Sequence, residues 1–369
     1  MGYEVDFLPV GSGESSGDAI AFRYGNLFGP RSEQRVGVID GGTLESGQAL
    51  VDHILGFYRT NVLDHAFLSH PDLDHASGLR IVLEKLDVQQ LVMHLPWAHS
   101  NAIGGLWKDG RFIQTKLDKR LRETLECAHE LESFATGRIR IHEPFAGTTN
   151  GDQSILVLGP TQAYYEDLLP HFLDTPPPDL GKLLSTLYPP PPPPPPRSYG
   201  LLDMIASGAL RVPLQLVDED RAHELLDDTG ITSARNNSSM ILLLTVDGHK
   251  LLFTGDAGIQ ALTLAADFAL SIGVRLDDLE FLDVPHHGSR RNLGPSVLAR
   301  VKARTAFISA AGKTDTKHPS KRVVNALLRR GTTVYATQGN KVYYYLNAPR
   351  RPGWVYPPPS LTWSNRVET

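Results

Sequence analysis

The stretch Ser-His-Pro-Asp-Leu-Asp-His-Ala-Ser-Gly at residues 69–78 constrains this chain most, because four metal-competent side chains fall within six residues. These side chains are His70, Asp72, Asp74 and His75. The mostly apolar run 65–68 predicts a short buried strand before them, and the spacing over 79–86 predicts a helix after them. Alternate side chains of an extended segment point the same way, so we expect His70, Asp72 and Asp74 to converge. Ligands spread over a loop and a helix start suit two metal ions better than one. The alternative to a metal site is a polar helix cap that happens to contain histidines.

Two further polar motifs follow apolar strands in the second half of the chain. Residues 240–254 predict a β-hairpin with an Asp-Gly turn, and the hairpin ends in Gly255-Asp256-Ala257. The apolar run 279–284 predicts another strand, which Pro285-His286-His287-Gly288-Ser289 follows. Each motif lies at a strand end. We therefore expect Asp256 and the two histidines to reach the same sheet edge as the first motif.

The first motif resembles the His-x-His-x-Asp-His signature of the metallo-β-lactamase superfamily, with Asp72 in place of the second His. This variant is similar to the soluble domain of the ComEC-type competence proteins and their free-standing relatives. The resemblance covers Val5 to Leu346 apart from an insertion. It implies an α/β (α+β) fold, an αββα sandwich of two mixed sheets flanked by helices, with a metal site at one sheet edge.

The resemblance also implies how two divalent ions are bound. Asp256 matches the carboxylate that bridges the two metals, and one of His286 and His287 is expected to join Asp74 and His75 at the second metal. The other histidine would orient the substrate or support the ligands. The strand end fixes the alternation only to within one residue, so the choice between them stays open. The candidate metal ligands are His70, Asp72, Asp74, His75, Asp256, His286 and His287.

The loop before the hairpin departs from the superfamily pattern. Where the superfamily usually places a metal-binding His, this chain has Asn236 and Asn237, a replacement found in the ComEC-like branch. The first metal site would then keep His70, Asp72 and Asp256, with an Asn oxygen or water. Oxygen-rich sites favour harder ions, so we expect Mn²⁺ to support activity at least as well as Zn²⁺, with Mg²⁺ as a further option.

Composition bounds the class of protein. A chain of 369 residues can bury a large core, and its 41% hydrophobic and 21% charged residues are ordinary globular values. The net charge of −5 gives no global basic signature, so nucleic-acid binding would need a local patch. The single cysteine, Cys127, excludes an internal disulfide and argues against a cysteine-rich zinc site. No signal peptide and no membrane span are apparent, so we expect a cytoplasmic enzyme.

We expect a single domain over residues 1–369, with a Pro-rich helical insertion at about 162–229 and a loosely packed Pro-rich tail at about 348–369. The insertion contains eight consecutive prolines at 189–196. Proline can neither donate to a sheet nor continue a helix, so this run is a polyproline II rod or disordered. The insertion would carry helices at 201–206 and 219–226, and it is a candidate contact for a partner or a second copy of the chain. Elsewhere, residues 115–135 predict one long amphipathic helix.

A phosphodiesterase or nuclease is the function we favour, with a nucleic acid or nucleotide as substrate and a water activated by two metal ions. Arg290 and Arg291 directly follow the His-His-Gly-Ser run and suit a phosphate, as do the lysines around His318. Asn236 and Asn237 are further candidate substrate contacts. Asp74 is a candidate catalytic residue that orients the water. His318 would line the pocket, because His318-Pro319 resembles another element of the same branch, and it is the second catalytic candidate.

Two other classes remain open. The same metal site serves hydrolysis of a lactone, thioester or amide, and an apolar pocket without convergent Arg or Lys side chains would favour that class. A non-catalytic metal-binding module is the third class, and a metal content well below one ion per chain would favour it.

Overall fold

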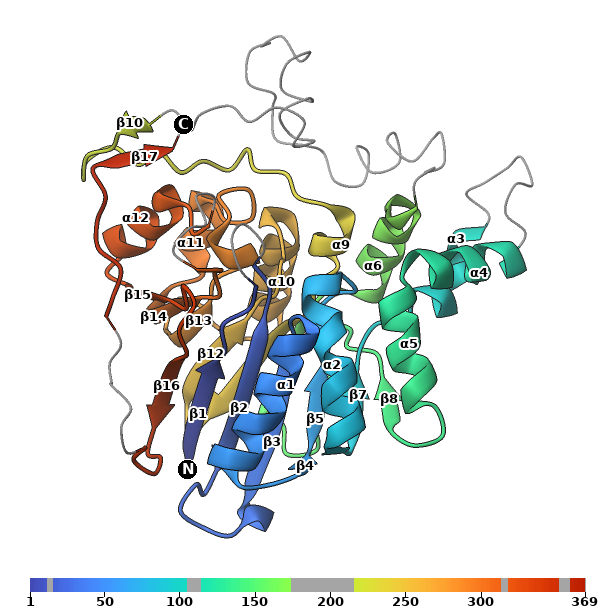
Figure 1. The fold of residues 1–369 in the computed structure, drawn as a ribbon. Coiled ribbons are helices and arrows are strands. Elements are labelled where there is room, and N and C mark those ends of the chain that lie inside the picture. Colours follow the sequence, from blue (N-terminus) through green and yellow to red (C-terminus); the bar gives the residue numbers. More distant parts are fainter. Residues whose placement is uncertain (12–15, 105–113, 174–215, 313–317, 352–358, 369) are drawn as a thin grey trace.

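In the computed structural model the described residues are 1–11, 16–104, 114–173, 216–312, 318–351 and 359–368. Two mixed sheets pack face to face, and helices cover their outer sides (Figure 1). This arrangement confirms the αββα sandwich that the resemblance implied. The eight prolines at 189–196 and the helix predicted at 201–206 lie outside the described residues.

The first sheet has the order β16-β1-β2-β3-β5-β7-β8. Its strands β1, β2, β3 and β16 pair antiparallel, whereas β3, β5, β7 and β8 run parallel. Parallel strands end at one edge, so the loops that follow β3 and β5 meet there. The bounds are β1 (Gly2–Phe7), β2 (Ala19–Gly25), β3 (Gln34–Gly41), β5 (His65–Phe67), β7 (Gln90–Val92), β8 (Arg140–His142) and β16 (Val342–Leu346).

The second sheet has the order β15-β14-β13-β12-β11-β9, and its four strands from β12 to β15 are parallel. The bounds are β9 (Ile155–Gly159), β11 (Ile241–Val246), β12 (His249–Phe253), β13 (Leu279–Asp283), β14 (Ala303–Ile308) and β15 (Thr333–Ala336). Two small sheets pair β4 (Val62–Leu63) with β6 (Asp87–Val88) and β10 (Leu216–Asp218) with β17 (Arg366–Glu368).

The helices pack on the outer faces of both sheets and carry the connections between parallel strands. The α-helices are α1 (Leu44–His53), α2 (Leu73–Lys85), α3 (Ser100–Gly104), α4 (Gln114–Thr124), α5 (Glu126–Ala135), α6 (Gln162–Leu168), α9 (Ala234–Asn237), α10 (Ile259–Ser271), α11 (Pro295–Arg300) and α12 (Lys321–Arg329). The other helical turns are η1 (Arg31–Glu33), the π-helix η2 (Ile54–Tyr58), η3 (Pro96–His99), η4 (Leu169–Phe172) and η5 (His286–Gly288).

Aromatic side chains fill the space between the two sheets. Alternate residues of β1 point inward, and Phe7 of β1 meets Phe307 of β14 with ring centroids 5.4 Å apart. Phe281 of β13 packs against Phe307 at 5.1 Å. Aromatic pairs of this geometry add about 0.5–1.5 kcal/mol each beyond the area they bury. Because both sheets contribute to this cluster, the site loops are held on one rigid support.

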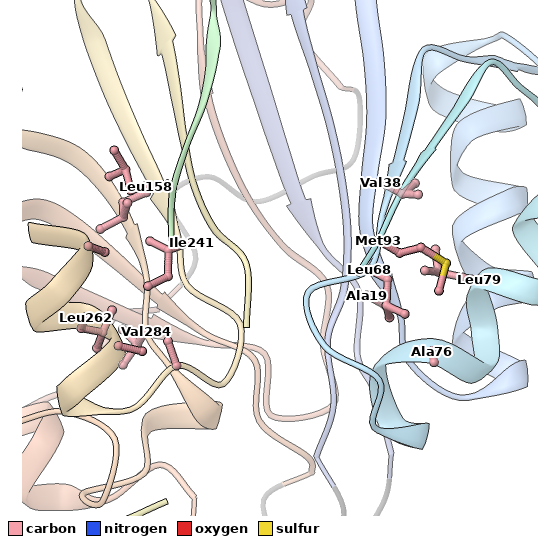
Figure 2. Close-up of a cluster of buried hydrophobic side chains, with 14 of the residues drawn as sticks. Ala19, Val38, Leu68, Ala76, Leu79, Met93, Leu158, Ile241, Leu262 and Val284 are labelled. Atoms are coloured by element: carbon pink, nitrogen blue, oxygen red, sulfur yellow. The ribbon is translucent and has the colours of Figure 1, made fainter. Parts of the chain in front are cut away.

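The remaining core lies between each sheet and its outer helices (Figure 2). On one flank, Leu79 of α2 packs toward Leu68 and Met93, which follow β5 and β7. On the other flank, Leu262 of α10 lies toward Ile241 of β11. The apolar faces of α2 and α10 thus fix the two helices that start beside the polar motifs.

Three expectations about helices and the tail are wrong. The helix expected over 115–135 is broken at Leu125, whose backbone (φ −117°, ψ 44°) leaves the helical region between α4 and α5. Residues 219–226 form no helix but follow β10 as a loop. The described part of the tail is tied down, because β17 pairs with β10 and Arg351 bonds Asp6 at 2.8 Å. These tertiary partners lie too far along the chain for a local pattern to indicate them.

Gly78, inside the first motif, allows α2 to approach β3 closely. Its backbone N–H donates to the carbonyl of Gly42 at 2.9 Å, and a Cβ here would overlap the carbonyl oxygens of Gly41 and Thr43. The absence of a side chain therefore sets how deeply the first turn of α2 enters the site.

We predict that Gly78→Ala lowers the free energy of unfolding by about 1–3 kcal/mol, because backbone must move to admit the methyl group. Gly56→Ala is the matched control, since a Cβ at Gly56 meets no atom within 4 Å. Urea unfolding of the three proteins measures the difference. Equal stability of the Gly78 variant and the wild type would contradict the packing argument.

Candidate metal centre

The first motif enters the site from the end of β5. Asp72 is the N-cap residue of α2, with extended backbone (φ −73°, ψ 149°), and α2 already begins at Leu73. Asp74 and His75 therefore both lie in the first helical turn. The expectation that Asp74 alternates with His70 and Asp72 along an extended segment is wrong, because the helix begins earlier than expected. His70 and Asp72 stay close, with Nε2 and Oδ2 3.7 Å apart.

Asp256 lies at the centre of the polar cluster, in the turn after β12. One of its carboxylate oxygens, Oδ1, is 3.5 Å from Nε2 of His75 and 3.9 Å from Nε2 of His287. The other, Oδ2, is 3.7 Å from Nε2 of His70 and 3.6 Å from Nε2 of His286. The structure thus brings together side chains from three separate motifs, as the strand-end placement predicted.

Asp40, at the end of β3, holds the first motif in place. Its Oδ1 accepts the backbone N–H of Ser69 at 2.7 Å, and its Oδ2 accepts the Ser69 hydroxyl at 2.5 Å. Oδ2 also lies 2.7 Å from Nδ1 of His75. A carboxylate at Nδ1 fixes the proton there and leaves Nε2 of His75 to face Asp256.

Asp18, just before β2, is a site residue that the sequence analysis missed. Its carboxylate lies 3.6 Å from Nδ1 of His287 and 3.8 Å from Nδ1 of His75. Asp18, Asp256 and His287 form one group whose donor atoms lie within 4.8 Å of one another, and Asp74, His75 and His287 form another. In the sequence, Asp18 is a single Asp after a Gly/Ser loop, a pattern that is common at turns and therefore does not indicate a site residue.

The donor set fits divalent metal ions. Nε2 of His70, His75 and His287 and Oδ1 of Asp256 are buried, and none has a hydrogen-bond partner among the described residues. Orphaned buried polar atoms are costly, and they converge here on a shared space. Imidazole nitrogens and carboxylate oxygens together suit Zn²⁺ and Mn²⁺.

The electrostatics of the centre also favour a cation. Burial opposes ionisation of Asp256, but the histidines around it, His286 foremost, outweigh burial and lower its pKa. Burial, aided by His75, holds the pKa of His70 well below its usual value. His70 is thus a neutral imidazole beside an ionised carboxylate, the protonation state that metal binding needs. For His75 and His287, burial opposes the charged ring, but nearby carboxylates, Asp256 foremost, outweigh burial and raise the pKa, so a bound cation would displace a proton from each ring.

The remaining predicted site residues lie at different distances from this centre. Asn236 is buried beside Nδ1 of His286, 3.0 Å from its amide nitrogen, whereas Asn237 lies beside Gly258 at the start of α10. The ring of His318 is 5.7 Å from that of His286, so His318 adjoins the centre. Two other buried histidines, His94 and His99, lie in an aromatic cluster around Tyr165.

The predicted arginines, Arg290 and Arg291, are exposed, and a third arginine contacts a proposed metal ligand. Electrostatic neighbours of Arg290 include Arg322, Glu368 and Asp227. By contrast, Arg235, which the sequence analysis missed, has its Nη1 3.5 Å from Oδ1 of Asp72. Arg235 directly precedes Asn236, in the loop where this chain departs from the superfamily pattern. That position was the one feature of the sequence that could have indicated a site residue.

A groove of about 670 Å³ leads away from Asp72 and Arg235 between α2 and α5. Its mouth carries the exposed side chains of Leu44 and Leu73, at 58% and 69% exposure. Arg80 lies further along, paired with Glu84 and Glu130. The groove is contiguous with the centre and offers room for the non-reacting part of a substrate.

Comparison with known proteins places the site in context. The family model described as "Metallo-beta-lactamase superfamily" matches residues 32–313. The ComE operon protein 3 of Bacillus subtilis (strain 168) is 28% identical over 137 residues, which are 37% of this chain and 17% of that protein. The chain thus matches less than a fifth of that relative's length.

Solved structures give more distant similarities. The metallo-β-lactamase fold protein YhfI of Bacillus subtilis is 9% identical, with 93% of this chain and 99% of that chain covered and a TM-score of 0.43. A diphosphatase from the PhnP family is 10% identical, with coverage of 94% and 98% and a TM-score of 0.41. CmlA, a diiron β-hydroxylase from Streptomyces venezuelae, is 12% identical, with coverage of 93% and 54% and a TM-score of 0.43.

We predict that Asp40→Ala weakens Mn²⁺ binding about 10–100-fold, because His75 loses the partner that orients it. Asp52→Ala, on the exposed face of α1, is the matched control and should bind as the wild type does. Calorimetric titration of stripped protein measures both affinities. Unchanged affinity in a folded Asp40 variant would show that this contact does not orient a ligand.

Proposed function

Because the chain belongs to the metallo-β-lactamase superfamily, we propose that it is a metal-dependent hydrolase acting on phosphodiester bonds of a nucleic acid or nucleotide. Superfamily membership supports the hydrolase activity. The observation that carries the proposal is the convergence on Asp256 of buried nitrogen atoms from separate motifs, none of which has a hydrogen-bond partner in the described part of the chain. Such a donor set is costly to maintain unless cations satisfy it.

The proposed roles follow the geometry. The ligands would be His70, Asp72, Asp74, His75, Asp256 and one of His286 and His287. When bound by these residues, two divalent ions would supply polarisation of the scissile group and a lowered pKa of the attacking water. Asp74, in the first turn of α2, would orient that water, and His318, beside His286, would assist proton transfer to the leaving group. Asp40 and Asp18 keep the ring nitrogens of His75 and His287 aimed inward.

The phosphate preference rests on arginines near the centre. Arg235 contacts Asp72, so its guanidinium can reach a substrate bound beside that carboxylate. A guanidinium pairs two phosphate oxygens at once and stays charged at any working pH. Arg290 and Arg291 remain proposed substrate contacts, as do Asn236 and Asn237. Of the lysines around His318, those at positions 313 and 317 lie outside the described residues.

One observation favours a second candidate function, hydrolysis of a lactone or thioester. Leu44 and Leu73 expose apolar surface at the mouth of the groove that starts at Asp72. An acyl chain would cover that surface, at about 25 cal/mol per Å² of apolar area removed from water. A substrate comparison therefore includes both a phosphodiester and an acyl lactone.

The other aspects of the proposal concern organisation and location. We propose one domain over 1–369 and a cytoplasmic protein. No helix of the described residues is long and apolar enough to cross a membrane. A contact with a partner or second copy through the insertion stays a prediction, because most of 162–229 lies outside the described residues.

We predict that protein purified without chelator binds about two divalent ions per chain and hydrolyses a phosphodiester with Mn²⁺ at least as fast as with Zn²⁺. The double variant Asp74→Ala, Asp256→Ala should lose both the metal and the activity. Elemental analysis and a substrate screen test this. Unchanged metal content in the double variant would overturn the proposed site.

We also predict that Arg235→Ala, and separately Arg290→Ala with Arg291→Ala, slow phosphodiester turnover about ten- to a hundredfold, or about 1–3 kcal/mol. Metal content should stay unchanged, since no arginine is a proposed ligand. Turnover of a neutral lactone is the control reaction and should change little. Undiminished phosphodiester turnover in either variant would remove that arginine contact from the proposal.

A further inference from the structure

Two consecutive histidines reach the same carboxylate because the backbone turns in an unusual way. His286 and His287 both have left-handed backbones, with φ of 47° and 55°, and Gly288 follows at 76°. Each left-handed residue other than glycine costs about 1–2 kcal/mol. An extended chain would point neighbouring side chains in opposite directions. The left-handed turn instead brings Nε2 of both rings within 3.9 Å of Asp256.

The two histidines approach different oxygens of Asp256. His287 shares Oδ1 with His75, whereas His286 shares Oδ2 with His70. His70 in turn lies 3.7 Å from Asp72. His70, with its neighbour Asp72, and His286 thus lie on the Oδ2 side of the carboxylate, which we call the first pocket. His75 and His287 lie on the Oδ1 side, which we call the second pocket.

Hydrogen bonds show which nitrogen of His286 carries the proton. Asn292 donates its amide N–H to the carbonyl of Asp256 at 2.7 Å, which turns its Oδ1 toward His286. That oxygen lies 2.9 Å from Nδ1 of His286, so Nδ1 is the donor and Nε2 carries the lone pair. The amide nitrogen of Asn236 also lies 3.0 Å from Nδ1 of His286, so this tautomer requires the nitrogen and oxygen of that amide to exchange places. The hydroxyls of Thr232 and Ser233 that hold the amide can either donate or accept, so the exchange keeps both hydrogen bonds.

An imidazole lone pair facing an ionised carboxylate oxygen at 3.6 Å is unfavourable unless a cation lies between them. Histidine nitrogens and carboxylate oxygens that bind one ion at about 2.0–2.2 Å lie at such separations from each other. The loop that holds Asn236 supplies no histidine to the first pocket.

We propose that His286 is a ligand of the metal ion in the first pocket, supplying the nitrogen that the Asn236 loop lacks, while His287 binds the ion in the second. This inference rests on the proposed dinuclear metal site. It assigns both histidines, where the sequence analysis assigned one to the second metal and left the choice open. Asn292 and Asn236 are then positioning residues for His286.

The test is the Mn²⁺ stoichiometry of stripped, reloaded protein, measured by equilibrium dialysis and elemental analysis. Substitution by Asn is preferred at position 286, because Asn tolerates a left-handed backbone and is too short to replace Nε2. His223→Asn is the matched control, since the side chain of His223 is exposed and pairs with Asp220, three residues earlier in the chain. Circular dichroism checks the fold, and His286→Ala provides a second variant if the first is unfolded.

We expect about two ions per chain in the wild type and in His223→Asn, and about one in His286→Asn. Adding Asp72→Ala to His286→Asn removes a ligand of the same pocket and should leave about one ion, whereas adding Asp74→Ala should leave none. Two tightly bound ions in His286→Asn would overturn the inference and leave the proposed function standing. The reverse pattern in the double variants would place His286 in the second pocket and also overturn it. A wild type that binds less than one ion would instead refute the proposed function itself.

Discussion

The buried carboxylate of Asp256 lies close to histidine side chains from both halves of the sandwich. His70 and His75 reach it from the first sheet, and His286 and His287 reach it from the second. Any shift of one sheet against the other would separate these groups. The aromatic layer between the sheets, with Phe7 and Phe307 in contact, resists such a shift because close-packed interiors deform little. The precision of the site therefore depends on a core that contains none of its residues.

The sequence was most informative where hydrophobic runs end in polar motifs. Parallel strands bring their ends to one edge, so the positions of Asp256 and of the first motif followed from pattern alone. The resemblance to a known family added the order of the motifs and the expected ions. Both kinds of argument agree with the convergence that the structure describes.

Other features depend on contacts that a local pattern does not reveal. Asp18 and Arg235 lie in loops and become site residues only because distant strands carry them there. The expected alternation failed at Asp74 because α2 starts at Leu73, within the motif. The choice between His286 and His287 assumed an extended strand end, where neighbouring side chains point in opposite directions. The backbone there is left-handed, and both rings reach Asp256. Backbone handedness at non-glycine residues leaves little trace in a sequence.

The contact between Arg351 and Asp6 bears on how the chain acquires its structure during synthesis. Asp6 and Glu4 lie on β1 and point away from the aromatic layer into a buried space that Arg351 also occupies. The two bonded residues are 345 positions apart, so a ribosome releases the carboxylates long before it releases their arginine. Until then, among the described residues, Arg23 is the buried cation that pairs with Glu4, and β1 lacks the neighbouring strand β16. The first sheet of a nascent chain thus stays incomplete until β16 and Arg351 have been synthesised, with a charged gap and an open strand edge that chaperones commonly shield.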